Sequence, residues 1–216
     1  MTIGLAQLIS ERESEQGRSL TAGVVIGLVT NNNDPDGLSR VKVKFPWLSG
    51  LNESYWARVA SPMAGNDRGA FFLPEIDDEV LVMFAHGDVR FPYVIGSLWN
   101  GKDKPPADNA DGKNNVRVIK SRSGHVIRLN DEDGKETLEI VDGTGKNSVV
   151  IDTATNSITI SADGDITLAA PNGAIRLSGK AIDIESSADS TLSAGTSMTV
   201  KAGGALNAVG QPVNLN

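Results

Sequence analysis

The chain has 216 residues, a formal net charge of −7 and no cysteine, which excludes disulfides and thiolate metal sites. The charge divides into about −4 before Gly101 and about −3 after it, so neither half offers the basic surface that a phosphate backbone requires. All aromatic residues (3 Trp, 2 Tyr and 5 Phe) precede Gly101. Because a core without rings is narrow, we expect the second half to form a slim, elongated domain.

Residues 1–20 are predicted to form an N-terminal arm. Ile3, Leu5, Leu8 and Ile9 give it a short apolar stripe ahead of the charged run "ERESEQGR". This stretch lacks a basic segment followed by an apolar core, and no run in the chain approaches membrane-spanning length. We therefore expect synthesis in the cytoplasm without a signal peptide.

Residues 21–100 are predicted to form a small antiparallel barrel. "TAGVVIGLVT" is typical of a strand, "NNNDPDG" of a turn, and "LSRVKVKFPWL" alternates so that Val41, Val43 and Phe45 share one buried face. Further strand-like segments are "SYWARVASPMAG", "GAFFLPEIDDEVLVMFAHGD", interrupted at residues 74–78, and "RFPYVIGSLWNG". About five strands with short, mostly antiparallel connections favour a closed or nearly closed barrel.

Residues 101–115 are rich in Pro, Gly, Asn and Asp and are predicted to be a linker or neck. Residues 116–216 then carry a degenerate repeat of two apolar residues spaced two apart. The spacing between pairs begins near eleven residues and settles near eight. The pairs are Val116/Val118, Ile127/Leu129, Leu138/Ile140, Val149/Ile151, Ile158/Ile160, Ile166/Leu168, Ile175/Leu177, Ile182/Ile184, Met198/Val200, Leu206/Ala208 and Val213/Leu215. Repeats of one short strand and one turn indicate a stacked β-helix.

Two β-helical arrangements fit this repeat. In a single-chain β-helix, the units give only about four coils, whereas three chains wrapped around a common axis build a longer rod. The trimer is favoured because such short strands bury enough apolar area only when three chains close the core. The predicted axial core is Val149, Ile151, Ile158, Ile160, Ile166, Leu168, Ile175, Leu177, Ile182 and Ile184, and the predicted tip is Val213, Leu215 and Asn216.

Three motifs, in this order, resemble the spike family of contractile injection machines: "GLSRVKVKFPWLSG", "SYWARVASPMAGNDRGAFFLPEIDDEVLVMFAHGDVRFPYVIGSLWNG" and "IKSRSGHVIRLNDEDGKETLEI". This family includes the baseplate assembly protein V of phage tails and the C-terminal part of VgrG proteins. The resemblance implies an OB-type barrel followed by a triple-stranded β-helix, as an intertwined homotrimer. It also implies that the protein lies beneath a trimeric hub and tail tube. When the sheath contracts, such a spike is expected to pierce the target envelope and to contact the target membrane transiently. A phage tail, a tailocin, a type VI system and an extracellular injection particle fit equally.

The chain departs from the family pattern in several places. The family usually reads Gly-Asp-Glu-Val where this chain has "DDEV" at residues 77–80. No lysozyme-like insertion and no hub-like domain are present, so a separate chain is expected to supply the hub. The metal-binding His-x-His tip of some phage spikes has no counterpart in "GGALNAVGQPVNLN". We therefore expect no apical metal, no cofactor, and a tip capped by a separate protein of the PAAR type.

The sequence supports a catalytic or metal-binding site less well than it supports this mechanical role. His86 and His125 lie in different predicted domains, and adjacent carboxylates at residues 77–79 would splay apart in a turn. The carboxylates Asp163, Asp165, Asp183, Glu185 and Asp189 are interpreted as the solvated outside of the rod. We predict that the protein is not an enzyme. The alternatives are a polysaccharide-degrading single-chain β-helix and an OB-fold nucleic-acid binder. The latter would use Lys42, Lys44, Arg58 and Arg68 beside Trp47, Tyr55 and Trp56.

Overall fold

The computed structural model describes residues 23–47 and 53–213, and these form an all-β structure with one short 3₁₀ turn at Ala85–Gly87. The predicted arm at residues 1–20 and the tip residues Leu215 and Asn216 lie outside the described residues. The chain divides into two compact units, Met1–Asp163 and Gly164–Asn216. The first unit contains a barrel sheet, a small hairpin and a second five-stranded sheet.

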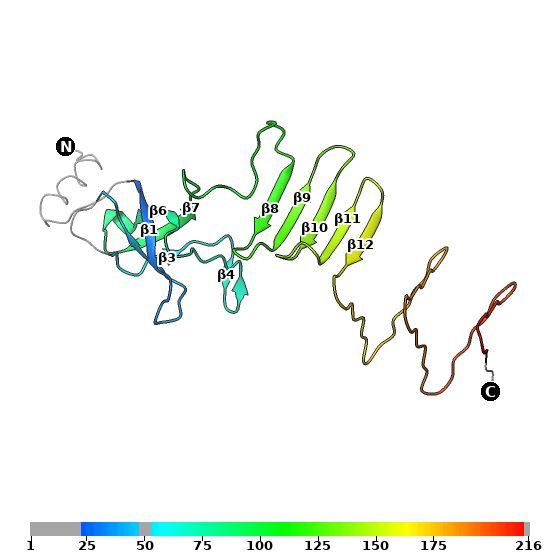
Figure 1. Cartoon of the computed structure of the whole chain (residues 1–216). Helices are drawn as coiled ribbons and strands as arrows, with labels where there is room; N and C mark the ends of the chain where they lie inside the picture. The colour runs from blue at the N-terminus through cyan, green and yellow to red at the C-terminus, as the bar shows by residue number, and fades with distance from the viewer. Residues whose placement is uncertain (1–22, 48–52, 214–216) are drawn as a thin grey trace, which may run out of the picture. The chain divides into compact units, whose positions relative to one another are not determined.

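The barrel sheet has the strand order β2-β1-β6-β7-β3 (Figure 1). Its strands are β1 (Val24–Asn31), β2 (Lys42–Lys44), β3 (Arg58–Val59), β6 (Glu79–Phe84) and β7 (Pro92–Ser97). The expected antiparallel pairing holds for β1 with β2, β1 with β6 and β6 with β7. The β3–β7 pair is parallel, because the chain passes through another hairpin and β6 between these two strands.

Two backbone hydrogen bonds curl this sheet into a closed barrel. The Val41 N–H donates to the Ala57 carbonyl at 3.0 Å, and the Ala57 N–H donates to the Val41 carbonyl at 2.7 Å. Val41 precedes β2 and Ala57 precedes β3, and these are the two edge strands of the sheet. Joining them removes the exposed edges that an open sheet would leave.

The barrel core is aliphatic with two aromatic rings. Val41 and Val43 are fully buried and Phe45 nearly so, which confirms the alternation expected from the sequence. Phe45 packs edge-to-face against Phe84, with ring centroids 5.5 Å apart. The core residues are Val29, Val41, Val43, Phe45, Ala57, Val80, Val82, Phe84 and Val94.

The hairpin formed by β4 (Ala64–Gly65) and β5 (Arg68–Gly69) lies between β3 and β6 in the chain. The sequence predicted a separate strand in "GAFFL", ahead of the interruption at residues 74–78, and this is wrong because β5 ends at Gly69. The Ala70 N–H still donates to the Met63 carbonyl, but Phe71 and Phe72 belong to no strand and are 73% and 70% exposed. Phenylalanine favours strands, but these two residues form none, because no strand among the described residues lies beside them to pair with.

The second sheet is an antiparallel meander in chain order, drawn as successive green to yellow arrows in Figure 1. Its strands are β8 (Val116–Lys120), β9 (Val126–Asn130), β10 (Thr137–Val141), β11 (Ser148–Asp152) and β12 (Ser157–Ser161). A single-chain β-helix instead pairs each coil in parallel with the next. The antiparallel pairing of β8 to β12 therefore gives that alternative no support in this part of the chain.

The backbone of the second unit bends at regular intervals, but residues 164–213 form no strand. Within these residues, the backbone–backbone hydrogen bond joins the Gly173 N–H to the Ala170 carbonyl at 3.1 Å. Bends separate extended segments and recur at intervals of eight residues, which matches the spacing of the apolar pairs. The bends lie at residues 163–164, 171–173, 179–180, 187–188, 195–196, 203–204 and 211–212.

Candidate functional site

One face of the second sheet collects the apolar pairs of four successive strands. Leu138 on β10 lies opposite Leu129 and Ile151, while Ile140 lies opposite Ile127 and Val149. β12 continues the pattern, because its two isoleucines lie opposite Val149 and Ile151. Residues directly opposite on adjacent strands point to the same side of a sheet. We call this surface the apolar face: Ile127, Leu129, Leu138, Ile140, Val149, Ile151, Ile158 and Ile160.

The apolar face is largely uncovered within one chain. Val149 is half-buried, but Ile140 is 51% exposed and Ile158 is 69% exposed, and the other members are exposed as well. A sheet normally buries its apolar side against a second layer. Contiguous exposed apolar surface on this scale marks an interaction site. Four predicted axial residues, Val149, Ile151, Ile158 and Ile160, are brought together here.

The opposite face of the sheet is mainly polar. Arg128 on β9 lies opposite Glu139 on β10, and their side chains form an ion pair at 3.3 Å. Val150 and Thr159 share this face, on β11 and β12. The sheet therefore has one side suited to water and one side suited to another apolar surface.

The register of β8 differs from the sequence prediction. Ile119 lies opposite Ile127, and Arg117 lies opposite Leu129, so Ile119 joins the apolar face and the predicted pair Val116/Val118 points to the other side. The sequence missed Ile119 because the apolar residues of β8 occur in both alternating phases.

Arg117 brings a charge to the end of the apolar face. Its Nη1 donates to the Asp131 carboxylate at 2.5 Å and to the Asn114 carbonyl at 2.8 Å. This pairing holds the guanidinium against the chain segments that flank β8 and β9.

The remaining predicted axial residues belong to the second unit. Ile166, Leu168, Ile175, Leu177, Ile182 and Ile184 lie in its extended segments, and all are at least half exposed. Val213, the described member of the predicted tip, is also exposed. Their location on an axis remains a prediction.

The turn between β10 and β11 is organised by Asp142. Its carboxylate accepts hydrogen bonds from the Thr144 hydroxyl at 2.8 Å, from the Asn147 side chain at 2.9 Å, and from the Lys146 and Asn147 N–H groups at 3.2 Å. These donors, the Thr144 hydroxyl foremost, hold the pKa of Asp142 well below its usual range. The same turn reaches the chain just after β12, because Asn147 Oδ1 accepts the Asp163 N–H at 3.0 Å and Lys146 Nζ pairs with the Asp163 carboxylate at 2.6 Å.

His125 has a structural role in the neighbouring turn. Its Nδ1 accepts a hydrogen bond from the Gly143 N–H at 3.0 Å. His86 lies in the 3₁₀ turn with φ of 52°. Among residues 23–47 and 53–213, no group of three His, Cys, Asp or Glu side chains could hold a metal ion.

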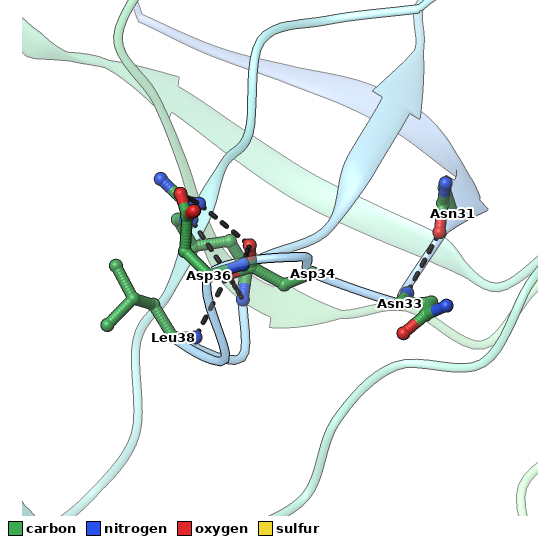
Figure 2. Close-up of polar contacts among 6 residues, drawn as sticks. Asn31, Asn33, Asp34, Asp36 and Leu38 are labelled. Atoms are coloured by element: carbon green, nitrogen blue, oxygen red, sulfur yellow. Dashed lines mark hydrogen bonds and ion pairs between the residues drawn. The ribbon is translucent and has the colours of Figure 1, made fainter.

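Asp34 organises the loop between β1 and β2, and Figure 2 shows its side chain turned toward that loop's own backbone. The carboxylate is 2% exposed and accepts hydrogen bonds from the N–H groups of Asp36, Leu38 and Arg40 at 3.1 to 3.2 Å. Arg40 adds Nε at 2.8 Å and Nη2 at 2.7 Å. Donation by the Arg40 side chain is the main reason that the pKa of Asp34 is strongly lowered. A carboxylate with five donors is a structural anchor rather than a metal ligand or a base.

The carboxylates at residues 77–79 serve different partners. Asp78 Oδ2 accepts the Glu75 N–H at 2.8 Å, and Glu79 Oε2 accepts from the Asn100 side chain at 3.2 Å. Asp77 has a φ of 73°, a left-handed conformation that glycine adopts most easily. This explains why a glycine suits the position that Asp77 occupies in the "DDEV" turn.

Carboxylates pair with two basic side chains beside Trp56, and one of these, Lys42, belongs to the set considered for nucleic-acid binding. Lys42 pairs with Glu53 at 2.9 Å, and Arg40 pairs with Asp34. Both cations also lie over the Trp56 ring, at 5.8 Å for Arg40 and 5.4 Å for Lys42. The Glu53 carboxylate therefore reduces the positive charge that a single-stranded nucleic acid would meet at Lys42.

No helix in the described part of the chain has the length and hydropathy needed to cross a membrane. Comparison with known proteins shows which part of the chain resembles a known family. Residues 25–99, which span the barrel, match the family model of the type VI secretion system/phage-baseplate injector OB domain.

Several type VI secretion system spike proteins are similar to this chain. VgrG1a of Pseudomonas aeruginosa is 30% identical over 153 residues, covering 65% of this chain and 24% of VgrG1a. VgrG2a of the same organism is 34% identical over 111 residues, covering 50% of this chain and 13% of VgrG2a. VgrG3 of Vibrio cholerae is 38% identical over 82 residues, covering 36% of this chain and 8% of VgrG3.

The chain thus spans about a quarter or less of the length of these relatives. The matched barrel and the similarity to several spike proteins agree with the three motifs found in the sequence. Residues 25–99 thus carry the OB domain of type VI secretion system and phage-baseplate injectors, and the chain is similar to several type VI secretion system spike proteins.

Proposed function

We propose that the chain is a non-enzymatic spike subunit that assembles as an intertwined homotrimer. The OB barrel docks beneath a trimeric hub and tail tube, and the C-terminal repeats form a triple-stranded β-helix that pierces the target envelope when the sheath contracts. The relatives named above support a role in the spike or baseplate.

The observation that carries the proposal is the exposed apolar face of a single-layered sheet. Leaving Ile140 and Ile158 in water is unfavourable by roughly 25 cal/mol for each Å² of apolar surface that association could bury. Three copies around one axis would close the three faces into a dry core. The eight-residue repeat would then extend this core from β12 toward Val213.

The proposed mechanism is mechanical. Interchain strand pairing and a narrow aliphatic core give the shaft stiffness, so thrust applied at the barrel reaches the tip. The tip, with Val213, Leu215 and Asn216, is proposed to receive a PAAR-type protein, and no cofactor takes part. Assembly into a virion tail or injection-particle baseplate follows from this role.

Sedimentation equilibrium of the full chain tests the proposal. We expect a particle of three times the 22.7 kDa chain mass, with little dependence on salt because the interface is apolar. A monomer at micromolar concentration would contradict the spike. Release of reducing sugar from cell-wall material would support the enzyme alternative, and a salt-dependent shift of single-stranded DNA would support the nucleic-acid binder.

A further inference from the structure

The outside of the barrel carries apolar side chains where water would favour polar ones. Strands covered on both sides read as continuous apolar runs, whereas strands with one side in water alternate apolar and polar residues. β2 alternates, because buried Val43 is flanked by Lys42 and Lys44. β1 does not alternate, since residues 24–29 include no polar side chain. This contrast indicates that something covers the outer side of β1.

The strand registers place the outward side chains of β1 beside those of β6 and β7. Val24 lies opposite Met83, and Met83 lies opposite Tyr93. Ile26 lies opposite Leu81 in the next row. Residues directly opposite on adjacent strands share one side of the sheet. We call this surface the outer patch: Val24, Ile26, Leu28, Leu81, Met83 and Tyr93.

The outer patch is open to solvent in the described part of the chain. Val24 is 48% exposed, and Ile26 and Met83 are each 45% exposed. Gly96 lies opposite Leu81, and a Cβ added at Gly96 would meet no atom within 4 Å. The patch therefore has room for an apolar side chain beside Leu81. Contiguous exposed apolar surface marks an interaction site.

A segment that covers the outer patch must pack through its side chains and cannot extend the sheet. β1, β6 and β7 lie inside the strand order β2-β1-β6-β7-β3, so each already pairs along both edges. A helix laid against a sheet is a common second layer. Such a helix presents apolar residues spaced three and four apart.

Residues 1–22, which lie outside the described residues, lead directly into β1 and carry this spacing. Leu8 and Ile9 follow Leu5 at distances of three and four residues. Residues 10–22 connect this apolar stripe to Gly23 and span up to roughly 43 Å when extended. β1 and β7 are only about 10 Å apart across the patch. The connection is therefore long enough for the stripe to fold back over all three strands.

The charges beside the outer patch also match this segment. Lys44 lies opposite Leu28, and Arg58 lies opposite Tyr93 with its Cζ 5.8 Å from the centre of that ring. Neither cation forms an ion pair with a carboxylate of residues 23–47 or 53–213. The run "ERESEQGR", which follows the apolar stripe, contains three glutamates. These carboxylates suit the two unpaired cations.

We propose that the predicted arm folds back over the outer patch of its own barrel. Leu5, Leu8 and Ile9 cover the apolar side chains of β1 and β6, and the glutamates that follow lie beside Arg58. The arm is then a second layer of the barrel, and its apolar stripe is not available to another protein. This inference goes beyond the spike role proposed above and does not depend on the homotrimer.

Cross-linking tests the proposal because the natural chain has no cysteine. The full chain carries Ile9→Cys with Met83→Cys, and a short bis-maleimide bridges the roughly 10 Å between packed layers. We expect a link within one chain, seen by mass spectrometry as two joined peptides in a monomeric band. Val24→Cys, opposite Met83, gives a second position on the patch. Ile9→Cys with Asn66→Cys, on the β4–β5 turn, is the control and should give little link.

Placing the two cysteines on different chains identifies what covers the patch. Ile9→Cys and Met83→Cys are put on two differently tagged, co-expressed chains, and we expect no linked dimer. A linked dimer would assign the patch to the arm of a second copy. No link to either patch position in both arrangements would mean that the arm does not cover the patch. Both results overturn the inference, and sedimentation of the same samples tests the homotrimer separately.

Alkylation measures the covering of the patch directly. In Met83→Cys, a polar maleimide should react several-fold faster once Leu5→Ser and Leu8→Ser are added, because the shortened stripe no longer shields the thiol. Gln7→Ser, a polar exchange outside the stripe, is the matched control and should leave the rate unchanged. Equal rates with and without Leu5 and Leu8 would overturn the inference.

Discussion

The Asp34 carboxylate and the Arg40 guanidinium form a two-point ion pair across the β1–β2 loop, with nitrogen–oxygen distances of 2.7 and 2.8 Å. The same carboxylate receives three backbone N–H groups. One side chain thus organises residues 34–40, which the sequence marks only as a turn. Replacement of Asp34 should loosen the loop and its attachment to β2.

Acidification should weaken the barrel through Asp34. Its pKa in the folded protein lies below the unfolded value of about 3.9, so its contribution to stability is fully present above that value and is lost as the pH falls below it. Asp34→Asn should lower the unfolding midpoint at pH 7 and flatten the loss of stability below pH 4. Tryptophan fluorescence isolates the barrel because all three tryptophans precede Gly101. Asp67→Asn, on the β4–β5 turn, is the control, and an unchanged acid slope in Asp34→Asn would contradict the assignment.

Substitution of an axial residue should prevent trimer formation. Ile166→Asp would place three carboxylates at one level of the proposed core, and each unpaired buried charge costs several kcal/mol. Sedimentation should then show a monomer with an intact barrel by fluorescence. Thr167→Asp, one residue away and in the opposite phase, should remain trimeric. A heat-resistant Ile166→Asp trimer would show that Ile166 is not axial.

Truncation of a side chain in the barrel core should destabilise the barrel. Val82 is fully buried between β1 and β7, so Val82→Ala should cost about 2–3 kcal/mol in the free energy of unfolding. Denaturant titration followed by tryptophan fluorescence measures this loss. Val24→Ala, at a position 48% exposed on β1, should cost much less. Equal losses would contradict the position of the core.

A methyl group at Gly143 should disturb the contact between two turns of the second sheet. A Cβ added there would lie 2.4 Å from the Ser123 carbonyl oxygen, and Gly143 also donates its N–H to His125. Gly143→Ala should cost about 1–3 kcal/mol, as overpacking usually does. Hydrogen exchange should increase in residues 121–147. Gly96→Ala adds a methyl group that meets no atom within 4 Å and should leave the exchange of these residues unchanged.

Local patterns in the sequence predicted a large part of this protein. The alternation of Val41, Val43 and Phe45 identified a buried face, because a strand repeats every two residues. The eight-residue spacing of the apolar pairs predicted the bends of residues 163–212, since small and polar residues at the corners favour turns. The three motifs also indicated the family whose OB domain matches residues 25–99.

Other features depended on contacts between distant residues. The pairing of Val116 with Asn130 sets the register of β8 and brings Ile119 to the apolar face, although Val116/Val118 fits the sequence pattern equally well. The Val41–Ala57 bridge closes the barrel, and the parallel β3–β7 pair follows from the path of the chain.

The sequence by itself determined which side chains are apolar, how they are spaced and where the chain turns, because these are properties of neighbouring residues. Only the tertiary structure decided which strands pair, in which register, and where the Asp163 N–H meets the Asn147 side chain. The physical reason is that a shift of one residue reverses the faces of a strand without changing its composition. Hydrogen bonds between strands distant in the sequence select one of these registers.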